Sequence, residues 1–148
     1  MIVAILRPDS WNLPLFLHVL GALVLFGGAV AATAFGITVW RGHAHAALLA
    51  RLAFRTLVFV MLPGWILMRV AAQWIVDKEF PHETPGWVGV GFAVSDAGLV
   101  LLLVLGVLGF LSSRRGGVGR LAAAFAVLSP VYLAALAVAW FAMSAKPG

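Results

Sequence analysis

The sequence lacks cysteine altogether and has few charged residues. Without cysteine, the 148-residue chain cannot form a disulfide, a thiolate metal site or an iron–sulfur cluster, and it has no cysteine nucleophile. Only 10% of the residues are charged, whereas 64% are hydrophobic and the mean hydropathy is +1.09. Charged residues make up about 25% of a typical soluble domain, so this composition predicts an integral membrane protein.

Motifs of common catalytic sites are also absent. The sequence contains no H-E-x-x-H pair, no glycine-rich phosphate loop after a strand, and no serine, histidine and aspartate set on a plausible scaffold. These absences disfavour hydrolytic catalysis and favour a non-enzymatic membrane module, either an accessory subunit of a larger membrane complex or a small-ligand-binding protein. Its expected partners are the lipid bilayer and other membrane subunits or further copies of the chain.

Apolar runs divide the chain into four predicted membrane spans of about 20 residues or more, the length that crosses a bilayer as a helix. The sequence therefore predicts one transmembrane domain, an all-α, up-down four-helix bundle. Pro63 lacks a backbone N–H and should kink the second helix near Phe59. The predicted spans cover residues 12–40, 53–76, 87–111 and 121–143.

Charges are distributed unevenly between the predicted loops. The loop from Arg41 to about Leu52 and the loop from Arg114 to Arg120 are basic, whereas the loop at 77–86 is net acidic. Basic loops stay in the cytoplasm, which predicts an N-out, C-out protein of the cell inner membrane. The net charge of +5 therefore reports topology, and we expect no nucleic-acid partner.

Small residues form a stripe on the first span. They project within an arc of about 80° that also contains His18, so we expect this face to pack against other helices. His18 then points into the bundle. The stripe consists of Gly21, Gly28, Ala32 and Gly36.

The second span carries Arg69 through an otherwise apolar segment, where an unpaired arginine costs at least about 2.5 kcal/mol. Trp65, Arg69 and Gln73 recur at a spacing of four and form one ridge. Counting from the predicted outer helix ends places four polar residues at a similar depth of about 9 to 15 Å. These residues are His18, Arg69, Asp96 and Tyr132.

Common depth predicts a buried ion pair between Arg69 and Asp96. The further hydrogen-bonding groups expected around the pair are Gln73, Ser95, Tyr132 and His18. Three hypotheses remain open for this cluster. It could serve only to fix helix packing, it could be a polar pocket in which Arg69 holds an anionic or quinone-like head group, or it could be part of a proton path.

Haem b between membrane helices is usually held by two facing histidines. Only His18 lies within a span, so Met68 would have to supply the second ligand. A redox subunit that binds haem b or a quinone in the same pocket is therefore the alternative function. The pair His43 and His45 lacks a third metal ligand and is interpreted as part of a cytoplasmic turn.

The start of the first span, Leu17-His18-Val19-Leu20-Gly21-Ala22 followed by Phe26-Gly27-Gly28, resembles small bacterial membrane proteins of the copper-resistance-D-like kind. The resemblance covers about 20 residues of the first helix. It implies a membrane bundle associated with haem, copper or a quinone. The sequence departs from that pattern because its other spans contain no histidine.

Overall fold

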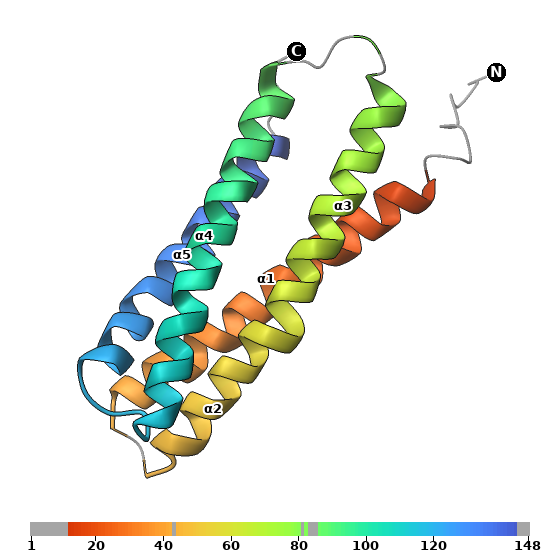
Figure 1. Cartoon of the computed structure of the whole chain (residues 1–148). Coiled ribbons are helices and arrows are strands. Elements are labelled where there is room, and N and C mark those ends of the chain that lie inside the picture. The colour runs from red at the N-terminus through yellow and green to blue at the C-terminus, as the bar shows by residue number, and fades with distance from the viewer. Residues whose placement is uncertain (1–11, 43, 81, 83–85, 145–148) are drawn as a thin grey trace, which may run out of the picture.

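The computed structural model describes residues 12–42, 44–80, 82 and 86–144, with the side chains of all of these except residues 87 and 142–144. All regular secondary structure in the described residues is helical (Figure 1). The predicted all-α four-helix fold is confirmed, because four helices are long and apolar enough to cross a membrane. They are α1 (Asn12–Trp40), a composite helix of α2 (Ala46–Thr56), the π-helical turn η2 (Leu57–Met61) and α3 (Leu62–Glu79), then α4 (Gly86–Arg114) and α5 (Arg120–Ser144).

Successive spans run in opposite directions, and α1 begins at the same end of the bundle at which α5 finishes (Figure 1). The α1 helix packs against α2, α3 and α5, and α4 lies against α5 and α2. By contrast, α3 and α4 make few contacts and diverge toward the loop that joins them. The core is centred on large side chains from all four spans, namely Leu25, Met61, Leu105, Phe125 and Tyr132.

The two ends of the bundle differ in charge. We call the end that carries the α1–α2 and α4–α5 connections the arginine end, because it holds Arg41, Arg51, Arg55, Arg114, Arg115 and Arg120. The opposite end, where α3 finishes with Asp77 and Glu79, is called the acidic end.

The predicted small-residue stripe on α1 is buried against the other helices. All four members are buried, and a Cβ atom on Gly21 would lie 2.4 Å from the backbone nitrogen of Met68. The backbones of α1 and α3 are therefore in direct contact at this level, which only a residue without a side chain permits. Gly21 therefore permits the close approach of α1 and α3, whereas Gly28 faces Met61 of η2 and Gly36 faces Phe125 of α5.

The predicted loop from Arg41 to Leu52 is wrong in its second half, because helix resumes at Ala46. Ala50 and Ala53 are buried one turn apart, while Arg51 and Arg55 are exposed on the other side of the helix. A segment that is charged on one face and apolar on the other forms an amphipathic helix. Arginines on one exposed face are compatible with a helix, so their number alone does not distinguish this segment from a loop.

The predicted distortion before Pro63 takes the form of the π-helical turn η2. The Leu62 N–H donates to the Leu57 carbonyl, five residues back, in place of the usual four. This wider turn contains Phe59, whose carbonyl would otherwise meet the proline ring. The composite second span therefore continues as helix across Pro63.

The orientation of the bundle remains a prediction, and cysteine labelling tests it. The chain has no native cysteine, so a single introduced thiol reports one site. We expect His82→Cys, at the exposed acidic end, to react with a membrane-impermeant maleimide in spheroplasts, and Val118→Cys, which is 64% exposed in the α4–α5 loop, to react only after lysis. The reverse pattern would contradict an N-out topology. Gly117 is unsuitable, because its φ is +75° and an added Cβ would meet the Ala46 carbonyl oxygen at 2.7 Å.

Candidate functional site

The predicted partner of Arg69 is confirmed. The α3 helix directs Arg69 toward α4, where its Nε–H donates to Oδ1 of Asp96 at 3.3 Å. Asp96 lies ten residues inside α4 and Arg69 ten residues before the end of α3, so both charges are about 15 Å from their helix ends. An arginine and a carboxylate thus meet well inside two membrane-length helices.

Two further side chains fix the position of the Arg69 guanidinium. Its Cζ lies 4.0 Å from the centroid of the Phe92 ring, an arrangement in which the electron-rich ring face attracts the cation. Phe92 precedes Asp96 by one helical turn, so α4 presents both to Arg69. On the other side, Nη1–H of Arg69 donates to Oε1 of Gln73 at 3.4 Å.

Gln73 links the ion pair to the acidic end of the bundle. Its Nε2–H donates to Oδ1 of Asp77 at 2.9 Å. Arg69, Gln73 and Asp77 follow each other at a spacing of four, so one face of α3 carries a row of polar groups about 12 Å long. This row leads from the depth of the ion pair to the helix end.

Trp65 lies one turn deeper on the same ridge. Its indole N–H donates to the backbone carbonyl of Ser95 at 3.1 Å. Successive residues of α4, Ser95 and Asp96, are therefore held by Trp65 and Arg69 of α3. We call this set the polar seam, and it consists of Trp65, Arg69, Gln73 and Asp77 on α3 and Phe92, Ser95 and Asp96 on α4.

The prediction that the ion pair is buried is wrong. The side chain of Asp96 is 60% exposed and that of Arg69 is 25% exposed. The reason is that α3 and α4 diverge toward this end of the bundle. The α1 helix packs against α3 and α5 packs against α4, and neither covers the space beside the ion pair. The polar seam consequently opens sideways, toward whatever surrounds the bundle.

His18 does not join the polar seam. Its Nδ1–H donates to the backbone carbonyl of Met68 at 2.9 Å, so it lies in the contact between α1 and α3. Met68 and Arg69 are neighbours in sequence but project about 100° apart around the helix. His18 therefore lies at the same depth as Arg69, as predicted, but its side chain contacts a different side of α3 from the ion pair.

Tyr132 is also separate from the polar seam. It is 1% exposed and packs in the core with Leu25 and Met61, and its hydroxyl has no hydrogen-bond partner among the described residues. The α5 helix that carries it packs mainly against α1 and α4. Tyr132 therefore contributes to packing and not to the group around Arg69.

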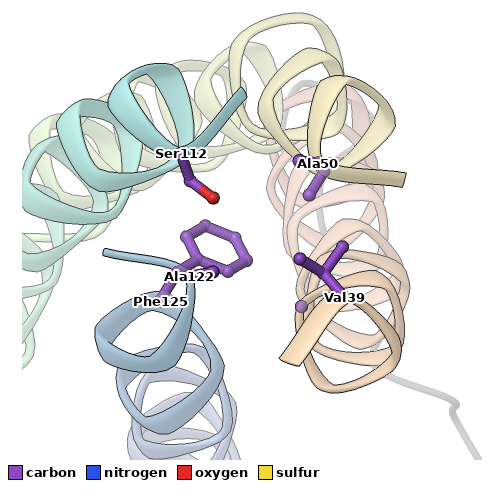
Figure 2. A pocket seen from close by; sticks show the side chains of 8 residues that line it. Val39, Ala50, Ser112, Ala122 and Phe125 are labelled. Atoms are coloured by element: carbon purple, nitrogen blue, oxygen red, sulfur yellow. The ribbon is translucent and has the colours of Figure 1, made fainter. Parts of the chain in front are cut away.

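A small cavity lies near the arginine end, away from the polar seam. Its volume is about 10 Å³, enough for at most one water molecule. Figure 2 shows that Ser112 and Phe125 project into it, and small side chains supply most of the remaining wall. This cavity is too small for an organic ligand.

Comparison with known proteins gives no assignment. No family model, curated protein or solved structure matches this chain. The resemblance to copper-resistance-D-like proteins therefore stays a prediction, and function has to be inferred from the polar seam itself.

The residues suggested for haem do not fit a haem between them. His18 and Met68 would have to lie on opposite faces of the porphyrin, yet the His18 ring is hydrogen-bonded to the Met68 backbone. One turn further on, Gly21 brings α1 into backbone contact with α3. The described residues also contain no cluster of three or more histidine, aspartate or glutamate side chains suited to a metal ion.

The chemistry that the polar seam offers is hydrogen bonding to a polar head group. Arginine has five N–H donors in a planar fork, and the contacts to Asp96 and Gln73 use two of those on Arg69. Donors therefore remain for an acceptor oxygen, and the exposed Asp96 carboxylate can accept from a donor beside it.

The sequence analysis did not include Phe92 and Asp77 in the site. Phe92 lies four residues before Asp96 and Asp77 lies four residues after Gln73, so helical spacing alone would have indicated both.

Proposed function

We propose that this chain is a non-enzymatic module of the inner membrane that binds the head group of a membrane-soluble small molecule at the polar seam, in the outer-leaflet half. One observation carries the proposal: an arginine–aspartate pair about 15 Å inside its helices is open to the side of the bundle. Charges at such a depth are costly in hydrocarbon unless a polar group covers them. Because no other span in the described part of the chain covers them, we expect this group to come from another molecule.

The exposed surfaces beside the seam define the class of ligand. Val70 on α3 and Val100 on α4 are 61% and 63% exposed, so apolar surface lies next to the ion pair. A ligand that suits both the ion pair and the apolar surface has a head group with an acceptor oxygen for Arg69 and an apolar tail that lies along the helices. Quinones and anionic amphiphiles share this chemistry, which agrees with the quinone association that the resemblance of the first span implies.

Short-tailed amphiphiles test the proposal on the purified protein in detergent. We expect decyl-quinone or decyl phosphate at about 100 times its Kd to raise the thermal midpoint by about 5 to 10 °C, because a ligand that binds only the folded state stabilises it. Decanol, which has the tail without the head, should give no comparable shift. Comparing the two active head groups identifies which class binds.

Arg69→Lys provides the matched test of the site, because lysine keeps the charge but loses the planar fork. This variant should lose most of the shift, whereas Arg120→Lys, the same change at the exposed start of α5, should keep it. Equal shifts in the two variants, or none with either head group, would contradict ligand binding at the seam.

The second candidate is an accessory subunit, in which a helix of a partner protein covers the seam. The same lateral exposure of Asp96 supports it. Chemical cross-linking in native membranes separates the candidates. A photo-crosslinking residue at Val70 should form a protein–protein product for an accessory subunit and none for a module that binds a small molecule.

A further inference from the structure

The arginine end of the bundle has six arginines and no acidic side chain. All six arginines are exposed. The five carboxylates of the sequence are Asp9, Asp77, Glu79, Glu83 and Asp96, none of which lies within residues 40–56 or 112–121. In the described residues no ion pair joins any of these arginines to a carboxylate.

Arg51 and Arg114 flank an aromatic contact between α2 and α4, and Arg55 lies one helical turn after Arg51 on α2. The rings of Phe54 and Phe110 have centroids 5.4 Å apart, and Cζ of Arg114 lies 5.7 Å from the Phe110 centroid. Arg51 precedes Phe54 by three residues, and Arg114 follows Phe110 by four. Because α2 and α4 run in opposite directions, both arginines are displaced from the aromatic pair toward the same end of the bundle.

An apolar strip on α4 leads away from this position. Leu103, Val107 and Phe110 are 53%, 59% and 41% exposed. With Arg114, they follow each other at spacings of four, three and four and therefore lie on one face of the helix. The surface thus combines a cationic group at the end of the span with an apolar track about 10 Å or more along it.

We propose that Arg51, Arg55 and Arg114, the α2–α4 arginine cluster, bind the phosphate of an anionic phospholipid whose acyl chain lies along Leu103, Val107 and Phe110. Guanidinium groups match phosphate oxygens with paired N–H donors, and basic pockets between membrane helices hold anionic head groups in this way. A zwitterionic lipid fits less well, because this end offers no carboxylate to its ammonium group. The site is independent of the polar seam and of the ligand proposed there.

Competition between lipids in native mass spectrometry tests the cluster. The full-length protein in detergent is given equal amounts of phosphatidylglycerol and phosphatidylcholine with the same acyl chains. We expect the wild type to bind phosphatidylglycerol about tenfold more, the effect of one to two basic residues close to an anionic head group. The double variant Arg51→Gln/Arg114→Gln should reduce this preference to about twofold or less.

The matched control removes the same charge elsewhere at the arginine end. Arg41→Gln/Arg120→Gln changes the first residue after α1 and the first residue of α5, and this variant should keep the preference. An equal fall in both double variants would overturn the proposal, because the preference would then follow total charge. Glycerol 3-phosphate that displaces the lipid at equal concentration would also overturn it, since the ligand would be a soluble anion.

Thermal stability gives a second measurement that does not depend on the folding of a variant. Phosphatidylglycerol, but neither phosphatidylcholine nor glycerol 3-phosphate, should raise the thermal midpoint of the wild-type protein. The same rise with phosphatidylcholine would contradict a site selective for anionic lipid.

Discussion

Gly21→Leu should largely prevent this protein from folding in detergent, and Gly21→Ala should already lower its thermal midpoint. An added Cβ at Gly21 would lie 2.4 Å from the Met68 nitrogen and 2.8 Å from the Gly64 carbonyl oxygen, and backbone atoms cannot move aside as side chains do. Inserting atoms into a packed core costs about 1 to 3 kcal/mol, and more when backbones must separate. Separation of α1 and α3 would also break the His18 hydrogen bond to Met68.

Gly27→Leu is the control for this prediction. Gly27 lies on the same helix, and an added Cβ there has no neighbour within 4 Å. Leucine also has a higher helix propensity than glycine, by about 0.8 kcal/mol, so this variant should be as stable as the wild type or slightly more stable. Folded yield by size-exclusion chromatography and the thermal midpoint by circular dichroism measure both. Similar losses in the two variants would mean that α1 and α3 do not meet at Gly21.

Helical period made the packing face of α1 predictable from sequence. Small residues on one arc indicate close approach of another helix, whichever helix that is. Depth was predictable for the same reason, because each residue adds a fixed rise. His18 and Arg69 were accordingly placed at similar heights, and the pairing of Arg69 with Asp96 was confirmed.

Direction around the helix axis was predicted less well than depth. Tyr132 and His18 share the approximate depth of Arg69 but face the core and α1, respectively. Which neighbour a side chain meets depends on how the helices tilt and diverge, and that is decided by contacts such as the one at Gly21. The exposure of Asp96 follows from the divergence of α3 and α4, which no local pattern in either span encodes.

Arg69 and Asp96 should be energetically coupled, and a double-mutant cycle measures the coupling. Arg69→Met leaves a carboxylate without its partner, and Asp96→Leu leaves a guanidinium without its partner, so each single variant should lose stability. The double variant removes both charges and should be less destabilised than the sum of the two losses. For residues in direct contact the interaction energy is typically about 0.5 to 3 kcal/mol. We expect a value near the middle of this range, because lateral exposure lets the surroundings screen part of the attraction.

A second cycle controls for the loss of charge alone. Arg114→Met removes an arginine at the opposite end of α4, and combined with Asp96→Leu it should give additive losses, because the two side chains share no contact. Both cycles are read from thermal midpoints in lipid nanodiscs, where the seam faces a bilayer. Additive losses for Arg69 and Asp96 would show that the two charges act independently. The polar seam would then have no charged pair at its centre, and the head group proposed to bind there would have to be held by Arg69 alone.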